Sequence, residues 1–496
     1  MVKVRFVVAG CFLSASVVCA AEDLGGMWGT AEREAKYYPI VDIPIPKAVP
    51  LRTGSMEVLP DGRLAVGTRR GDIYFVDGAF ASPPEPTFHL FATGQDEIFG
   101  LAWKDGAMTA TQFGEVSRIS DTNGDGVADR YETLSNGWGY AEGHEFAFGS
   151  KHDSDGNVWV ALGLSGSYKS HNLFRGWAVK VTPTGEMIPI CSGLRSPGGV
   201  GVNKEGVMFA TESQGPWNGC CSLKHLKPGG FLGHPASYNW YPYVPGMDAP
   251  SVEPNSPSRL QVEKKRVKEL VPPAVRFPYI KMGRSISGLR LNQTGGKFGP
   301  FEDQIFLGDY TLSVILRATT EQVNGVWQGA CYPFREGLAT GIMHVEFSPK
   351  GQLLAGGFTT TRQWPVRGEE LYALQRIDWS GEVPFEILEI NITPNGFRIH
   401  FTEPVDPVVA ADVATYTLST YTHNYAAGYG SPEVDHTTPV VTRAIPAKDR
   451  MSVDITLDGV VEGHIHDFDL GPMKSAGGET LLHTKAYYTV NEIPKP

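Results

Sequence analysis

One pattern recurs along the chain: a short apolar strand, a polar turn containing glycine, and a second apolar strand. Clear copies begin at Ser55, Ile98, His144, Pro197 and Gly341, and a degenerate copy begins at Ser287. The turn glycines Gly62, Gly106, Gly156 and Gly206 are 44, 50 and 50 residues apart, and Gly351 follows after a further 145. Four-stranded blades repeating every 40 to 50 residues or so are typical of β-propellers, so six copies predict six blades. A β-sandwich is the alternative, but its turns would not repeat the same pattern six times.

Two segments depart from this repeat. Residues 217–284 are rich in proline, glycine and aromatic residues, and we expect them to form an ordered insertion over one face of the ring. After Trp379, alternating strands such as FEILEINIT and SVDITLDGV continue without the repeated pattern, which indicates a separate β-sandwich. The predicted chain is therefore all-β, with a six-bladed propeller over residues 21–380 and a small Ig-like sandwich over 381–496. We assign the sandwich no chemistry.

The N-terminus has the features of an export signal. Residues 1–20, MVKVRFVVAGCFLSASVVCA, combine a basic start, an apolar stretch and small residues near Ala20. Residues 8–11 also resemble a lipoprotein cleavage box, but the apolar stretch before Cys11 is very short. No later segment approaches the roughly 20 apolar residues of a membrane span. We therefore expect a periplasmic or secreted protein without a membrane span.

Charge and missing motifs exclude several classes of function. Forty-three basic and 54 acidic residues give a net charge of −11, without a dense Lys/Arg cluster, which excludes nucleic acid as a partner. The chain has no Cys-x-x-Cys-His motif for covalent haem, no glycine-rich dinucleotide fingerprint and no Gly-x-Ser-x-Gly elbow. An electron acceptor for a redox reaction would therefore be a separate molecule, such as a cytochrome c.

Export makes the cysteines candidates for disulfides, because an oxidising compartment permits them. Without Cys11 and Cys19, four remain: Cys191, Cys220, Cys221 and Cys331. Adjacent Cys220 and Cys221 could close a flat vicinal ring that covers a planar cofactor or a sugar. Alternatively, each could pair with Cys191 or Cys331, which involves less strain. The sequence leaves both arrangements open.

Residues 121–132, DTNGDGVADRYE, match the spacing of an EF-hand calcium loop. Positions 1, 3, 5, 9 and 12 carry oxygen-bearing side chains, position 6 is glycine, and position 7 offers a backbone carbonyl. The predicted ligands are Asp121, Asn123, Asp125, Val127, Asp129 and Glu132. Because the flanks do not read as paired helices, we expect a structural calcium site; the alternative is an acidic connector without metal.

His144 comes just before the inner strand of the third blade, where a propeller presents side chains to its axial pocket. Its position and near-neutral pKa make it a candidate general base, although a lone histidine is more often structural. The next blade reads GLRSPGGVGV and then TESQGPWNG. Together, these segments resemble the soluble quinoprotein glucose/sorbosone dehydrogenases, which are six-bladed propellers that use calcium and pyrroloquinoline quinone.

The resemblance covers the propeller and implies roles for several residues. His144 would take the proton of a sugar hydroxyl, and Arg195 would lie beside the quinone and stabilise negative charge. Gln214, Gly215 and Pro216 match the stretch that holds the cofactor calcium, and the nearby Cys220 and Cys221 are candidates for contacting the cofactor.

The chain also departs from the family pattern. Gly163 and Leu164 replace the aspartate that orients the histidine, and no lysine stands near residues 309–311. The paired arginines expected near residues 343–344 are missing, with only Arg335 close in sequence. We expect a sugar or polyol dehydrogenase; the alternatives are a calcium-dependent hydrolase or lactonase and a carbohydrate-binding propeller without catalysis.

Overall fold

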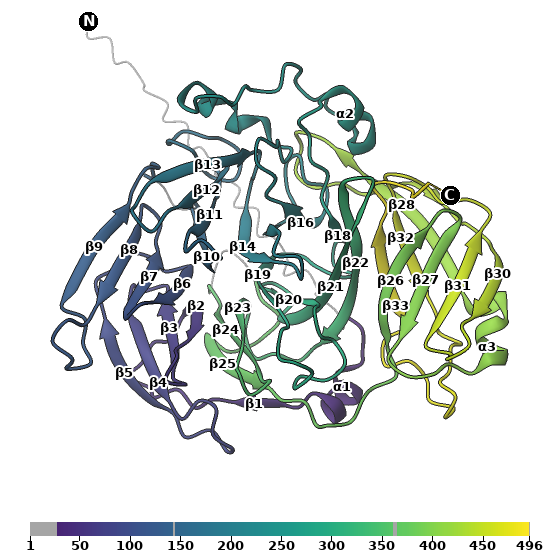
Figure 1. Ribbon diagram of the computed structural model, residues 1–496, viewed down its shortest axis with the longest axis horizontal. Coiled ribbons are helices and arrows are strands. Elements are labelled where there is room, and N and C mark those ends of the chain that lie inside the picture. Colours follow the sequence, from purple (N-terminus) through teal and green to yellow (C-terminus); the bar gives the residue numbers. More distant parts are fainter. Residues whose placement is uncertain (1–26, 142–143, 361–364, 496) are drawn as a thin grey trace, which may run out of the picture.

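The computed structural model describes residues 27–141, 144–360 and 365–495, so the predicted signal peptide lies outside the described residues. These residues form six four-stranded antiparallel blades, an insertion, and a C-terminal β-sandwich (Figure 1). The predicted all-β fold, a propeller followed by a sandwich, is confirmed. Among the described residues, no helix is long and apolar enough to cross a membrane.

Each blade has a strand at the ring axis and three strands outside it. Blade 1 contains β2 (Thr53–Val58), β3 (Leu64–Thr68), β4 (Ile73–Asp77) and β5 (Thr87–Ala92). Blade 2 contains β6 (Gly100–Lys104), β7 (Ala107–Thr111), β8 (Val116–Ser120) and β9 (Arg130–Ser135). Blade 3 contains β10 (Ala147–His152), β11 (Val158–Leu162), β12 (Trp177–Val181) and β13 (Met187–Ser192).

The remaining blades are less regular in sequence. Blade 4 contains β14 (Pro197–Val202), β15 (Met208–Glu212), β16 (Cys221–His225) and β18 (Val275–Phe277). Blade 5 contains β19 (Ile286–Leu291), β20 (Ile305–Asp309), β21 (Val314–Val323) and β22 (Val326–Arg335). Blade 6 contains β23 (Ile342–Phe347), β24 (Leu353–Phe358), β25 (Tyr372–Ile377) and the N-terminal β1 (Ile40–Asp42), which follows α1 (Ala31–Tyr37).

Two features close the ring. The inner strands β2, β6, β10, β14, β19 and β23 contact one another in that order, and β23 contacts β2. The inner strands also pack closely: a Cβ on Gly199 of β14 would lie 2.7 Å from the Cα of Gly288 on β19, so this point of contact requires glycine. Pairing of β1 with β25 joins the start of the propeller to its last blade.

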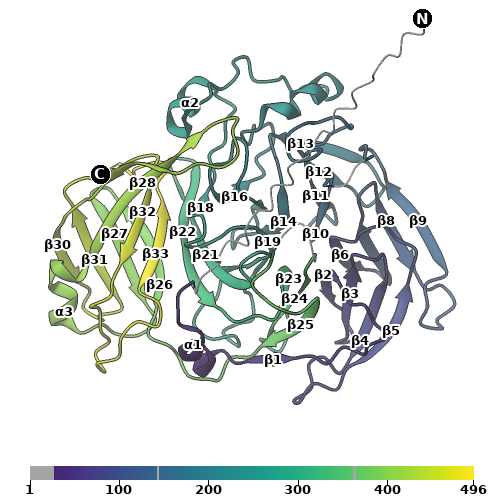
Figure 2. The ribbon, with the colours of Figure 1, turned by 180° about the vertical axis from the view of Figure 1, so that it is seen from behind.

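The predicted insertion boundaries are wrong at both ends. β16 and β18 fall within residues 217–284 but pair as the two outer strands of blade 4. The segment between them carries η1 (Pro235–Tyr243), β17 (Ser258–Arg259) and α2 (Leu260–Arg266), on one side of the ring (Figure 2). The sequence pattern does not show these boundaries because the last strand of blade 4 comes only after the inserted segment.

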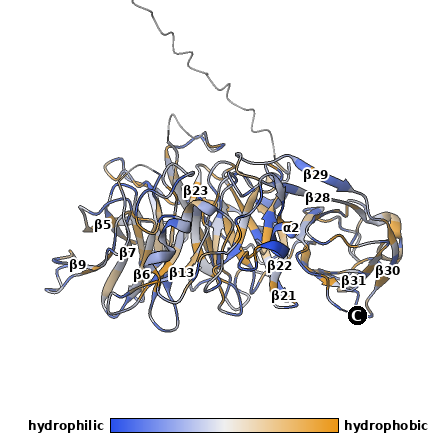
Figure 3. Cartoon of the chain, turned by 90° about the horizontal axis from the view of Figure 1, so that it is seen from above, coloured by the Kyte–Doolittle hydropathy of each residue, from blue (hydrophilic) through white to orange (hydrophobic). Residues whose placement is uncertain are grey.

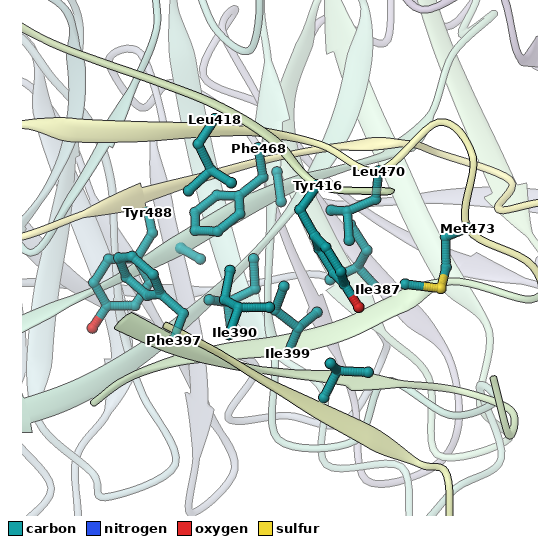
Figure 4. Close-up of a cluster of buried hydrophobic side chains, with 14 of the residues drawn as sticks. Ile387, Ile390, Phe397, Ile399, Tyr416, Leu418, Phe468, Leu470, Met473 and Tyr488 are labelled. Carbon is teal, nitrogen blue, oxygen red and sulfur yellow. The ribbon is translucent and has the colours of Figure 1, made fainter. Parts of the chain in front are cut away.

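The C-terminal part packs two sheets face to face. One contains β26 (Ile387–Thr393), β27 (Gly396–Phe401), β30 (Val441–Pro446) and β31 (Ser452–Leu457). The other contains β28 (Thr417–Tyr425), β29 (Glu433–Thr437), β32 (Ile465–Asp469) and β33 (Lys485–Thr489); α3 (Pro407–Ala411) and η2 (Val413–Thr415) precede β28. Phe397, Ile399, Leu418 and Phe468 are among the apolar side chains buried between the sheets (Figure 4).

This second sheet continues into the propeller. β33 pairs with β22, the outer strand of blade 5, and β28 pairs with β17 of the insertion, so one hydrogen-bonded sheet spans both parts. β25 ends at Ile377 and β26 begins at Ile387, but the division at residue 380 stays a prediction. Because of this shared sheet, backbone hydrogen bonds join the sandwich to the outer side of the propeller.

Candidate functional site

A cavity of about 440 Å³ lies at the propeller axis, within the range of roughly 300 to 1,000 Å³ that is usual for small-molecule sites. Its basic and imidazole side chains are Arg69, His144, Arg195 and Arg284. Its aromatic side chains are Phe99, Phe146, Phe148, Tyr168, Tyr279, Tyr310, Phe358 and Tyr429. None of the described lining residues is aspartate or glutamate, so the lining favours ligands with apolar ring faces and electron-rich oxygen atoms.

His144 and Arg195 occupy corresponding positions in neighbouring blades. His144 lies three residues before β10, and Arg195 lies two residues before β14. Both line the cavity, although 51 residues separate them in sequence. The structure therefore brings together the two residues predicted to carry the chemistry, without by itself testing their roles.

His144 has a constrained backbone and a perturbed imidazole. Its φ of 75° lies in the left-handed region, which is uncommon for a residue with a side chain. Burial lowers the pKa of His144 from its ordinary value, and the positive charges of Arg195 and Arg69 lower it further. This shift favours the neutral imidazole, the form in which a histidine acts as a general base.

Arg175 holds the segment that carries His144. Its fully buried guanidinium donates hydrogen bonds to four backbone carbonyls, those of Phe113, Gly139, Glu145 and Phe146. Burial lowers the pKa of Arg175 to about 10. Because these carbonyls belong to blade 2 and to both sides of His144, Arg175 fixes the path of the chain into the pocket.

Backbone carbonyls hold the guanidinium of Arg195, and a carboxylate holds its backbone N–H. Its Nε donates to the carbonyl of Ser167 at 3.3 Å, and its Nη1 donates to the carbonyl of Gln214 at 2.5 Å. Its backbone N–H donates to the carboxylate of Glu212, which forms a buried ion pair with Lys224. Among the described residues, no carboxylate pairs with the Arg195 guanidinium, so its charge is available to the pocket.

The Gln214–Pro216 stretch contacts Arg195 and its own turn, and the calcium role implied for it stays a prediction. Gln214 lines the cavity, but its carbonyl accepts the Arg195 guanidinium, and Gly215 and Pro216 are not among the lining residues. The backbone carbonyl of Gly215 accepts the N–H of Asn218 at 3.1 Å, within a tight turn. A Cβ on Gly215 would lie 2.2 Å from Cζ of Arg195, so glycine here serves the close approach of the guanidinium.

The disulfide expectations are wrong in both forms. Cys191, Cys220, Cys221 and Cys331 are all buried free thiols. Cys220, Cys221 and Cys331 belong to the apolar core between blades 4 and 5, and neither Cys220 nor Cys221 lines the pocket. Burial raises the pKa of the Cys220 thiol to about 12. These side chains act as small apolar groups of the core.

The 121–132 loop turns as expected but directs its side-chain oxygens at its own backbone. The Asp121 carboxylate accepts the N–H groups of Gly124 and Gly126, at 2.7 and 2.8 Å. Asn123, Asp125 and Asp129 likewise accept nearby backbone N–H groups. Glu132, at position 12, lies on β9 and pairs with Arg130, while Val127 is exposed. Within the described part of the chain, no three His, Cys, Asp or Glu side chains are placed to hold a metal.

Several lining residues escaped the sequence reasoning. Arg69 forms an ion pair with Glu97 at 2.8 Å and lies over the ring of Phe358, with its Cζ 5.3 Å from the centroid. Its turn, GTRRGD, has the composition of an ordinary polar connection between strands, so the sequence does not distinguish Arg69 from a surface residue. Arg335, the arginine nearest the expected quinone clamp, does not line the pocket and pairs with Glu34 instead. Tyr429 comes from the C-terminal domain, to which no chemistry was assigned.

The comparisons with known proteins are informative for the fold. Residues 87–266 match the family described as "Domain of unknown function (DUF7133)". No curated protein matches this sequence.

Solved structures are similar over about two thirds of the chain. A carbohydrate-active enzyme of family AA12 from Trichoderma reesei is 12% identical, with a TM-score of 0.50 over 70% of this chain and 97% of its own. The PQQ-bound aldose sugar dehydrogenase from Streptomyces coelicolor is 16% identical, with a TM-score of 0.45 over 68% of this chain and 98% of its own. The PQQ domain of the Coprinopsis cinerea pyranose dehydrogenase is 12% identical, with a TM-score of 0.45 over 69% and 97%. At 12% identity the likeness to the AA12 enzyme concerns architecture alone, so the chain is similar in fold to that enzyme.

Proposed function

We propose that this protein is an exported oxidoreductase that oxidises a hydroxyl group of a sugar or related polyol in the axial pocket. The observation that carries the proposal is the convergence of His144 and Arg195 on one aromatic-lined cavity. Aromatic rings suit the apolar faces of sugars, while a neutral imidazole and a guanidinium suit their hydroxyl groups. The similarity in fold to a carbohydrate-active enzyme of family AA12 agrees with a carbohydrate as the substrate.

In this proposal, His144 accepts the hydroxyl proton of the substrate. Arg195 stabilises the negative charge that develops on the same oxygen, since its guanidinium is fixed by Ser167 and Gln214. The hydrogen on the carbon that bears this oxygen then leaves as a hydride, and the hydride needs an acceptor. Pyrroloquinoline quinone, when bound, would supply that acceptor, and a separate carrier such as a cytochrome c would reoxidise it.

The lining fits the quinone better than it fits the accompanying calcium. None of the described lining residues is a carboxylate, and Arg195 is a cation that would hold a carboxylate of this polyanionic ligand. Arg69 also lines the pocket, but its guanidinium already pairs with Glu97. The Gln214 and Gly215 carbonyls that would bind calcium are engaged by Arg195 and Asn218. We therefore derive no step from a metal in this pocket, and a calcium-dependent lactonase finds no support in the lining.

The test combines the purified protein, pyrroloquinoline quinone and a panel of sugars and polyols, with the quinone absorbance as readout. Wild type should bleach the quinone with at least one substrate. His144→Ala should lower kcat by roughly 100-fold or more, with little change in melting temperature. Arg195→Ala should lower kcat by as much and should also lower the melting temperature, because the carbonyls of Ser167 and Gln214 lose the guanidinium. No absorbance change with any substrate contradicts the proposal, and binding without oxidation would identify a carbohydrate-binding propeller.

We also retain a structural calcium ion at Asp121–Glu132 as a proposal. Support comes from the oxygen-bearing residues at the ligand positions of this loop and from the turn at position 6, where Gly126 has a φ of 90°. Calcium should then raise the melting temperature, because a ligand bound only to the folded state adds stability. The double variant Asp121→Ala/Asp125→Ala should lose that shift. Equal melting temperatures of wild type in calcium and in chelator contradict the proposal.

A further inference from the structure

The C-terminal domain reaches over the rim of the axial pocket. The turn between β28 and β29 lies against blade 4, where the Trp217 N–H donates to the carbonyl of Ala426 at 2.7 Å. The hydroxyl of Tyr425 donates to the carbonyl of Gly233 at 2.5 Å, and its ring packs on that of Trp217. Seen along the edge of the ring, β28 and β29 run along one face of the molecule (Figure 3). The start of the turn is therefore fixed against blade 4 and the insertion.

This turn places Tyr429 in the wall of the pocket. The Cζ of Arg195 lies 5.0 Å from the centroid of the Tyr429 ring, so the guanidinium is enclosed between this ring and Gly215. A Cβ on the next residue, Gly430, would lie 2.8 Å from Nε2 of Gln214, which shows how closely the turn approaches the site. Tyr429 nevertheless remains 61% exposed, so most of its side chain is free to meet a ligand.

A second exposed tyrosine lines the same rim. Tyr168 is 52% exposed and follows Ser167, whose carbonyl accepts the Nε of Arg195. Both rim tyrosines are thus linked to Arg195, one from the propeller and one from the C-terminal domain. The aromatic rings deeper in the cavity, such as Phe99 and Phe358, are almost fully buried. The pocket therefore has an enclosed inner part and an open outer part with its own exposed aromatic surface.

We propose that Tyr168 and Tyr429 form an outer sugar subsite, so that the substrate is a saccharide of at least two rings. The inner ring would lie beside His144 and Arg195, and the second ring would contact the rim tyrosines. Tyrosine suits this role because its apolar face meets the C–H face of a sugar while its hydroxyl meets the sugar's hydroxyl edge. The inference rests on the proposed function for the inner ring and makes the C-terminal domain part of the binding site.

The experiment measures equilibrium binding by calorimetry, with glucose, maltose and cellobiose as probes and the full chain as the protein. Wild type should bind at least one disaccharide more tightly than glucose. Tyr429→Ala should weaken disaccharide binding by about tenfold and glucose binding by less than about threefold, because only the second ring loses its contact. Tyr429→Phe keeps the ring but loses the hydroxyl contact, so it should weaken disaccharide binding by less than Tyr429→Ala does. Tyr243→Ala, at a tyrosine 63% exposed but outside the pocket lining, is the matched control and should change nothing.

The outcomes separate the inference from the function on which it rests. Selective loss of disaccharide affinity in Tyr429→Ala, without oxidation of any probe by wild type in the quinone assay, supports the subsite and contradicts the oxidoreductase. Oxidation of glucose together with unchanged disaccharide binding in Tyr429→Ala supports the oxidoreductase and overturns the subsite. Equal loss for glucose and the disaccharides also overturns it, since a general disturbance of the pocket would then explain the effect. Absence of binding to all three probes counts against both.

Discussion

At the scale of single residues, the pH dependence of catalysis follows from the surroundings of His144. Burial and the charges of Arg195 and Arg69 lower its pKa below the ordinary value, and a general base works in its neutral form. We therefore expect kcat/KM to rise with pH and to level off, with a midpoint below about 6.5. Arg69→Met removes one of the charges, so the midpoint should move to higher pH.

The measurement is a pH profile of kcat/KM for wild type and for Arg69→Met, with buffers matched in ionic strength. Arg63→Met is the control, because Arg63 pairs with Asp61 on the surface and does not line the pocket. A wild-type midpoint above 6.5, or equal midpoints for wild type and Arg69→Met, would rule out His144 as a base in this electrostatic setting.

At the scale of elements, the sequence predicted those features that local chemistry determines. Gly62, Gly106, Gly156, Gly206 and Gly351 all have positive φ, between 75° and 89°, because each tight turn between two strands needs that backbone. The closing strand β1 escaped prediction because three residues, Ile40–Asp42, carry no pattern that distinguishes them from a loop. The outer strands of blade 4 escaped prediction because the insertion separates β16 from β18, which pair with each other. Local sequence limits the prediction of the site in the same way. The motifs indicate His144 and Arg195, whereas the position of Tyr429 depends on how the sheet of the C-terminal domain pairs with blade 5.

Arg175 illustrates how one buried side chain supports an element at the site. Replacement by methionine removes the hydrogen bonds that Arg175 donates to four carbonyls; those of Phe113 and Phe146 keep a second donor, Nε1 of Trp138 and the N–H of Gly163. A buried polar group that loses its hydrogen bond costs about 1 to 3 kcal/mol. We expect Arg175→Met to lower the free energy of unfolding by about 3 kcal/mol or more, as measured by urea denaturation. Hydrogen exchange in the segment around His144 should also accelerate, because its carbonyls lose their anchor.

The control for Arg175→Met is Arg130→Met, whose exposed guanidinium pairs only with Glu132 among the described residues. Exposed pairs of this kind are worth about 0 to 1 kcal/mol. If both variants lose the same stability, Arg175 does not support the segment that carries His144.

At the scale of the whole molecule, three distant parts of the chain meet in one buried charge network. Glu34 of α1 accepts hydrogen bonds from Arg335 at the end of β22 and from His483 of the C-terminal domain. Glu386, just before β26, accepts from the other nitrogen of His483, at 2.5 Å. The network joins the N-terminal helix, blade 5 and the sandwich, near the place where β22 and β33 already share a sheet. Docking of the sandwich therefore depends on charge as well as on backbone pairing, and its orientation fixes Tyr429 over the pocket.

This network predicts how stability depends on pH. Burial lowers the pKa of His483, but the carboxylates of Glu386 and Glu34 outweigh it and raise the pKa to about 9, above the ordinary value. Because the folded state holds the proton more tightly than the unfolded state, the protonated imidazole contributes its full stability below about pH 6.5, and the contribution is lost as the pH rises through about 9. His483→Gln cannot carry the charge, so it should be less stable than wild type by about 2 to 3 kcal/mol at pH 6, and this difference should shrink at pH 10.

Urea denaturation at pH 6, 8 and 10 measures the difference, with His89→Gln, at an exposed histidine paired with Asp77, as the control. A difference between wild type and His483→Gln that stays constant or grows with pH would show that His483 is neutral in the folded protein, and that the sandwich is held without its charge.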